Sequence, residues 1–148
     1  MSQLSNVLVT TDFSDRALAA VEQAAQLHEL LGSELTLLYV VEDHLPPILG
    51  GVSEEGRREI LERHRKEAEA RLAEYAAEHL PGCQAYTVSV VGVASREIVR
   101  YAAEHDHDLI VMASHGWGPI AQILVGSTTE RVLHRAPCPV LLVRSDGE

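Results

Sequence analysis

Short apolar runs alternate along the chain with longer segments in which apolar residues recur at helical spacing. The short runs are rich in Val, Leu and Ile, a composition typical of buried strands. They predict five strands, at 6–10, 34–41, 85–91, 108–113 and 139–144. Because strands that alternate with helices form βαβ units, the pattern predicts an α/β fold with a five-stranded parallel sheet and helices on both faces.

Four segments between these strands are predicted to be helical. The first runs from a cap at Ser14 to Gly32, which favours the left-handed conformation that ends a helix. The longest covers about 53–79, with apolar residues on one face and charged residues on the other. A third follows Ser95 as its cap, and a fourth covers about 127–134.

The same patterning predicts the order of the strands. A strand buried on both faces reads as nearly continuous apolar sequence, whereas an edge strand tolerates alternation. The run at 34–41 is nearly continuous, and the run at 85–91 alternates. This favours the doubly wound order 3-2-1-4-5 over the flavodoxin-like order 2-1-3-4-5. Ligands bind such sheets where the strand order reverses, which here lies between the first and fourth strands.

Composition narrows the possible functions. The chain has 148 residues, which suits one domain over 1–148, and 46% of them are hydrophobic, enough to bury a core. The formal net charge of −10 and the lack of a basic block argue against nucleic acid or an anionic membrane as partner. With no apolar run near the roughly 20 residues of a membrane span and no secretory pattern, we expect a cytoplasmic protein. Its cysteines, Cys83 and Cys138, are expected to be ordinary reduced thiols.

The segment 113–128, ASHGWGPIAQILVGST, has the chemistry of a phosphate-binding loop. Gly116 and Gly126 permit close approach of the backbone, and Ser127 with Thr128 offers hydroxyl and N–H groups at a helix N-terminus. The alternative is structural, with glycines that turn the chain and a serine that caps the helix. Spacing alone does not separate these alternatives.

The loop after the first strand, Thr10-Thr11-Asp12, is predicted to meet this segment where the strand order reverses. Asp12 suits two roles: an oxygen ligand for ribose hydroxyls or Mg²⁺, and the aspartate of a turn before the helix cap. His115 either donates to a phosphate or only orients its loop. The run HDHD at 105–108 is interpreted as a polar connection, since no third metal ligand lies in sequence reach.

Several stretches of the chain resemble the universal stress protein family. SHG, nine residues, GS and then TERVLHRAPCPVLLVR are similar to the C-terminal signature of that family. VTTDFSDRALAA, LLYVVED and VGVASREIVRYA also resemble it, so the similarity covers essentially the whole chain. The resemblance implies a Rossmann-like fold of the adenine nucleotide alpha hydrolase-like type and a homodimer. In one branch it also implies ATP binding through the pattern G-x2-G-x9-G-[S/T].

In that pattern Gly116 and Gly126 match the second and third glycines and Ser127 matches the hydroxyl residue, but Ala113 replaces the first glycine. A methyl group there either obstructs the approach of phosphate or ribose, or is harmless if the backbone is ordinary extended strand. The nine-residue insert also lacks the Lys or Arg of many members. Phosphate binding would then rest on backbone dipoles alone.

The resemblance implies further contacts to a nucleotide. Asp12 would approach the ribose or a bound Mg²⁺, Val40 matches the position whose backbone meets adenine, and Thr10 stands where a proline is often found. Met112 is expected to pack beside the same pocket rather than to contact ligand. The expected cofactor is ATP, with AMP or ADP as alternatives, and Asp12 is a metal ligand only if Mg²⁺ accompanies ATP. The expected binding set is Thr10, Thr11, Asp12, Val40, Met112, Ala113, His115, Gly116, Gly126, Ser127 and Thr128.

The last strand is expected at an edge of the sheet and is apolar throughout, so it requires cover. The same strand of a second subunit would provide that cover, and the resemblance also implies such a homodimer. The residues expected to pair are Val140, Leu141, Leu142 and Val143.

Two functions remain open on the sequence. The first is a small stress-response or regulatory protein that binds ATP or AMP at the loops after the first and fourth strands and acts on an unidentified protein partner. The second is a nucleotide-free dimeric interaction module of the same fold, for which Ala113 is the best argument. We do not predict an enzyme beyond weak ATPase activity, because no general base, nucleophile or Walker lysine is placed.

Overall fold

Strands and helices alternate along the whole part of the chain that the structure, a computed structural model, describes: residues 4–43, 53–114 and 126–145. Every predicted strand and helix is present, with ends at most two residues from those predicted. In chain order the elements are β1 (Asn6–Thr10), α1 (Asp15–Leu31), β2 (Glu34–Val41), α2 (Glu54–His79), β3 (Tyr86–Val91), α3 (Ala94–Glu104), β4 (Leu109–Ser114), α4 (Ser127–Arg135) and β5 (Val140–Arg144).

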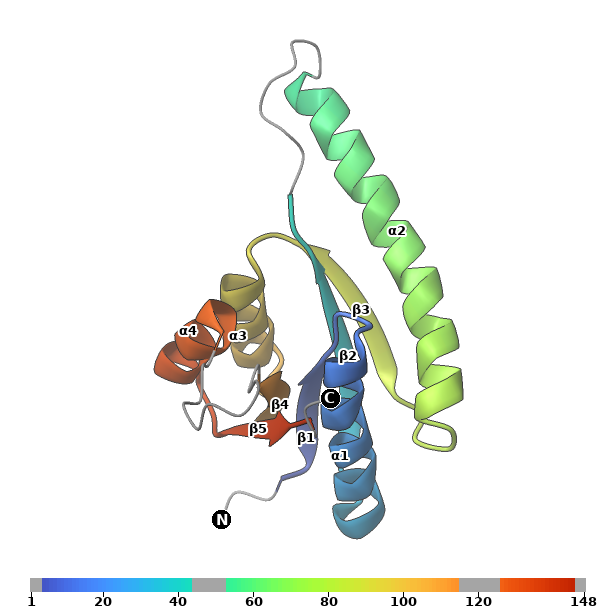
Figure 1. Ribbon diagram of the computed structural model, residues 1–148, viewed down its shortest axis with the longest axis vertical. Helices are drawn as coiled ribbons and strands as arrows, with labels where there is room; N and C mark the ends of the chain where they lie inside the picture. Colours follow the sequence, from blue (N-terminus) through green and yellow to red (C-terminus); the bar gives the residue numbers. More distant parts are fainter. Residues whose placement is uncertain (1–3, 44–52, 115–125, 146–148) are drawn as a thin grey trace.

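The strands form one parallel sheet in the predicted order, β3-β2-β1-β4-β5 (Figure 1). The central strand β1 pairs on both sides, so that Val9 lies opposite Leu37 of β2 and Val111 of β4. The strand order reverses between β1 and β4. The carboxyl ends of β1 and β4 are therefore adjacent at one end of the strands, which is where ligands of such folds bind.

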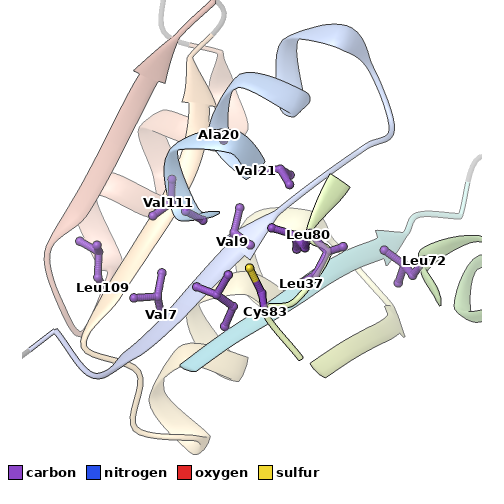
Figure 2. Close-up of a cluster of buried hydrophobic side chains, with 12 residues drawn as sticks. Val7, Val9, Ala20, Val21, Leu37, Leu72, Leu80, Cys83, Leu109 and Val111 are labelled. Carbon is purple, nitrogen blue, oxygen red and sulfur yellow. The ribbon is translucent and has the colours of Figure 1, made fainter. Parts of the chain in front are cut away.

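Each face of the sheet packs against one pair of helices. Successive residues of a strand point to opposite faces, so Val7 and Val9 pack with α1 and α2, and Leu8 packs with α3 and α4. Figure 2 shows the first of these two cores, in which Val21 of α1 and Leu72 of α2 meet the sheet. Burial on both faces explains why the central strands are continuously apolar.

The ends of α1 follow the prediction. The hydroxyl oxygen of Ser14 accepts a hydrogen bond from the backbone N–H of Ala17 at 3.2 Å. Gly32 takes the left-handed conformation, with φ 70°, and its N–H donates to the carbonyl of His28 at 2.9 Å. Both ends thus satisfy backbone groups that a helix leaves unpaired.

The predicted cap of α3 was wrong. The N-cap is Val93, without a side-chain hydrogen bond, and Ser95 lies buried within the first turn. The N–H of Gly92 donates to the carbonyl of Val41 at 3.0 Å. This bond holds the chain at the end of β3, and the helix starts two residues later. Position in the fold, rather than a capping side chain, therefore sets the start of α3.

Two further expectations from composition can be compared with the fold. Cys83 and Cys138 are both free, and burial raises the pKa of each thiol. A raised pKa leaves less thiolate at neutral pH and so makes these cysteines weak nucleophiles. Within the three described ranges, no helix has the length and hydropathy that crossing a lipid bilayer requires.

Candidate functional site

A pocket of about 190 Å³ opens at the carboxyl ends of β1 and β4. Three helices direct their N-terminal turns toward it, α1 through Ser14 and Arg16, α3 through Ala94, and α4 through Thr128 and Thr129. The N-terminus of a helix carries a partial positive charge and N–H groups without partners in the helix. Convergence of three such ends makes this pocket suited to a negatively charged group.

Most of the residues predicted to bind a ligand line this pocket: Thr10, Thr11, Asp12, Val40, Met112, Ala113 and Thr128. Gly126 and Ser127 are the N-cap and first residue of α4, directly before the pocket-lining Thr128. His115 and Gly116 lie outside the described residues. The structure therefore brings together residues from β1, β2, β4 and α4, of which Thr10 and Thr128 are 118 positions apart in sequence.

The start of α4 differs from the alternative in which Ser127 caps the helix. Gly126 is the N-cap, and no side chain makes the capping hydrogen bond. The carbonyl of Gly126 accepts the first helical bond, from the N–H of Glu130 at 2.9 Å. Within the described residues, the first-turn N–H groups of α4 therefore have no capping side chain and can bind a ligand or solvent.

Ala113 lies in β4 as ordinary extended strand. It pairs in register with Val143 of β5 and is not among the residues with positive φ. The side chain at this position therefore causes no backbone strain, and its effect is limited to the space that one methyl group takes at the pocket wall.

Asp12 closes a turn and also lines the pocket. Its Oδ1 accepts hydrogen bonds from the backbone N–H of Ser14 at 2.9 Å and from the Ser14 hydroxyl. The hydroxyl of Thr11 accepts from the N–H of Phe13 at 2.9 Å, and Phe13 has a left-handed backbone, with φ 67°. Turn formation and ligand binding were alternatives on the sequence. In the structure, the turn fixes the carboxylate at the pocket.

Sequence reasoning missed several lining residues, and Arg16 changes the chemistry most. It is the second residue of α1 and lines the pocket. The expectation that phosphate binding rests on backbone dipoles alone therefore leaves out a cationic residue, since an arginine is present at the pocket wall. Helical side chains tilt toward the N-terminus of their helix, so a long side chain just after a cap was the available signal.

The remaining missed residues complete the walls of the pocket. Ala94 and Ile98 of α3 supply an apolar wall beside Met112, and Met112 is buried as predicted. Glu42, which follows β2, adds a second carboxylate to that of Asp12. An apolar wall with a few polar groups is typical of small-molecule sites.

A second cleft, of about 550 Å³, lies between the end of β2 and the middle of α2. The residues that it shares with the first pocket are Asp12, Tyr39, Val40 and Glu42. On the floor of the second cleft the ring of Phe13 lies 4.9 Å from that of Tyr39, and the guanidinium of Arg71 lies 4.0 Å above the Phe13 ring. An aromatic and cation–π cluster thus joins the loop after β1 to α2.

The HDHD run lies directly before β4, at the amino ends of the strands. The pocket lies at their carboxyl ends, so the run does not reach it. Asp108 accepts hydrogen bonds from the backbone N–H of Ser5 at 3.1 Å and of Asn6 at 2.9 Å, and the bond from the Ser5 hydroxyl lowers the pKa of this carboxyl. His107 is buried, which an interpretation as a polar connection does not predict. Among the described residues, no cluster of His, Cys, Asp or Glu side chains is placed to hold a metal ion.

Comparison with known proteins gives a consistent result. The model of the universal stress protein family matches residues 4–144. Universal stress protein MJ0531 of Methanocaldococcus jannaschii is 34% identical over 93% of this chain and 81% of that protein. The solved structure of the hypothetical protein MJ0577 has a TM-score of 0.80 at 29% identity, and it covers 99% of this chain and 100% of its own. A universal stress protein in complex with cAMP has a TM-score of 0.65 at 27% identity, over 96% of this chain and 98% of its own.

Proposed function

Because this chain belongs to the universal stress protein family, we propose that it is a regulatory protein that binds an adenine nucleotide, ATP foremost. The proposed site is the pocket at the ends of β1 and β4. The observation that carries this proposal is the convergence of three helix N-termini on a pocket at the reversal in strand order. The complex of a related protein with cAMP supports an adenine nucleotide as the ligand class.

Each wall of the pocket suits one part of a nucleotide. The uncapped N–H groups of α4 and the hydroxyl of Thr128 suit phosphate oxygens. The apolar wall that includes Ile98 and Met112 suits the base, and the backbone of Val40 lies at the same pocket. The carboxylate of Asp12 suits ribose hydroxyls as an acceptor.

The donor set also suits Mg²⁺ that accompanies ATP. Mg²⁺ binds one or two carboxylates together with phosphate oxygens and water. Asp12 and Glu42 are two carboxylates at one pocket, and Asp12 is the proposed ligand. The ion would neutralise phosphate charge on a chain whose formal net charge is −10.

Titration calorimetry of the purified protein with ATP, with and without Mg²⁺, tests this function. Acid extraction of a separate sample first detects any nucleotide retained through purification. We expect saturable binding with micromolar affinity. Absence of binding at millimolar ATP, by protein that circular dichroism shows to be folded, would instead favour a nucleotide-free interaction module. The methyl group of Ala113 at the pocket wall is the observation that favours this second function.

We also propose a homodimer through β5. This strand lies at an edge of the sheet, and an apolar edge strand invites pairing with another chain. Val140 and Leu142 pack partly against the core, and Leu141 is 37% exposed on the other side of the strand. Antiparallel pairing with the same strand of a second copy would cover Leu141 and Val143.

A further inference from the structure

Arg16 is placed to reach beyond the N-terminus of its own helix. It follows Asp15 in the first turn of α1, whose N-cap is Ser14. Since the Cα–Cβ bonds of a helix tilt toward its N-terminus, a long side chain at this position extends over the end of the helix. The structure agrees, because Arg16 lines the same pocket as Thr128 and Thr129 of α4.

The position of Arg16 is unfavourable for the helix itself. Anionic side chains stabilise the first turn of a helix and cationic ones oppose its dipole. Asp15 follows this rule and Arg16 breaks it. Departures from a local rule are expected where a site requires the residue.

The charges at the pocket also require a cation. Among the lining residues that the structure describes, Asp12 and Glu42 are anionic and Arg16 is the one with a permanent positive charge. These carboxylates, on a chain of net charge −10, repel a phosphorylated ligand. A guanidinium compensates locally, and its planar fork matches two phosphate oxygens.

We propose that Arg16 binds the phosphate chain of the nucleotide and makes the pocket select phosphorylated nucleotides over the nucleoside. This inference rests on the proposed nucleotide site and names the group that sets its ligand preference. Affinity should rise with the number of phosphates, from adenosine through AMP to ATP. Arg16 makes this selection from α1, outside the glycine-containing segment 113–128.

Calorimetric titration of four proteins with ATP, AMP and adenosine tests the inference. They are the wild type, Arg16→Gln, Arg16→Lys, and Arg63→Gln as a control for net charge, since Arg63 is exposed on α2 away from the pocket. We expect Arg16→Gln to weaken ATP binding by about 10- to 100-fold, the range for losing a hydrogen-bonded charge. Adenosine binding should change little. Arg16→Lys should retain part of the ATP affinity, and Arg63→Gln nearly all of it.

Thermal unfolding without nucleotide provides a second readout. If Arg16 serves the ligand, Arg16→Gln should unfold at nearly the same temperature as the wild type, because removing a cation from the helix N-terminus offsets the loss of the contacts that Arg16 makes in the free protein. A lower unfolding temperature together with equal losses for ATP and adenosine would identify a structural role and overturn the inference. Unchanged ATP binding by Arg16→Gln would also overturn it, while the nucleotide site stands. If the wild type binds no nucleotide, the proposed function and this inference both fail.

Discussion

His107 places an ionisable ring in the core just before β4. It is buried, and within the described residues neither ring nitrogen has a hydrogen-bond partner. Burial lowers the pKa of His107 below its ordinary value of 6.5, and the neighbouring His105 lowers it further, against smaller opposite effects of Asp108 and Asp106. The folded protein therefore keeps this ring neutral at a pH where the unfolded chain already protonates it.

We expect this difference to make stability fall in acid. Above about pH 6.5 both states hold His107 neutral, so it adds no pH dependence. As the pH falls through 6.5, the unfolded state binds the proton first, and the free energy of unfolding decreases by up to about 1.4 kcal/mol per pH unit until the folded pKa is reached. Urea unfolding of the wild type and His107→Phe at pH 8, 7, 6 and 5 measures this contribution.

The exposed His134 supplies the control for that experiment. His107→Phe should lose less stability between pH 7 and pH 5 than the wild type, whereas His134→Gln should follow the wild type. Equal losses in all three proteins would show that groups other than His107 dominate the loss of stability between pH 7 and pH 5.

Replacing Ala113 at the pocket with glycine should change ATP affinity and stability in opposite directions. Ala113→Gly should raise the affinity for ATP, because Ala113 lines the pocket in a strand that needs no glycine and the change removes its methyl group. The same change should lower the free energy of unfolding by about 0.5–1 kcal/mol, the cost of glycine within a strand. Calorimetry and urea unfolding measure the two effects. Unchanged or weaker ATP binding would mean that the methyl group does not obstruct the ligand.

Among elements, α1 and α2 offer matched N-caps with different neighbours. Ser14 caps α1 and also donates to Asp12 at the pocket, whereas Ser53 caps α2 by accepting from Gly56 at 3.0 Å. Each serine-to-alanine change should cost about 1 kcal/mol of stability. Only Ser14→Ala should also weaken nucleotide binding, because it removes one of the two hydrogen bonds that hold the Asp12 carboxylate at the pocket. Equal affinities in the two variants would mean that the turn does not position Asp12 for the ligand.

The sequence pattern predicts that a strand or helix forms, but neighbouring elements determine which of its residues are buried. The alternation at 85–91 correctly predicted an edge strand, but Ser89 in it is buried and donates to the carbonyl of Arg65 at 3.1 Å. Along α2, Leu72 is buried as its helical spacing predicts, whereas His64 on the same face is exposed beside the second cleft. In Figure 1 the first half of α2 stands away from the sheet. Helical spacing specifies a face but not how closely it approaches a partner.

The residues of the candidate site also form two groups, those whose place at the pocket could be predicted from the sequence and those whose place could not. Positions that end strands, such as Asp12 and Ala113, were predictable because the carboxyl ends of parallel strands meet at one edge. Arg16 and Ile98 lie on helices, and their places at the pocket depend on how α1 and α3 are docked. The sequence spacing of Arg16 and Ile98 does not indicate how their helices pack on the sheet.

At the scale of the whole molecule, the proposed dimer can be tested through the exposed side of β5. Leu141→Lys should shift the protein from dimer to monomer, because a charge at the centre of an apolar strand pair is buried without a partner. Light scattering after size-exclusion chromatography measures the mass directly. Leu30→Lys is the control, since Leu30 is 79% exposed at the far end of α1. A monomeric wild type, or a Leu141→Lys dimer, would contradict pairing through this strand.

The order of the strands also has a consequence for synthesis on the ribosome. β1 is made first, yet it lies at the centre of the sheet and must wait for β4. Directly before these two strands, Asp108 accepts a hydrogen bond from the N–H of Ser5 across 103 positions. β1, β2 and β3 can assemble while the rest of the chain is still being translated, but Met112 and Thr129, which complete the pocket, emerge near the end. A nascent chain therefore has no complete pocket, and a ligand bound there would stabilise finished molecules only.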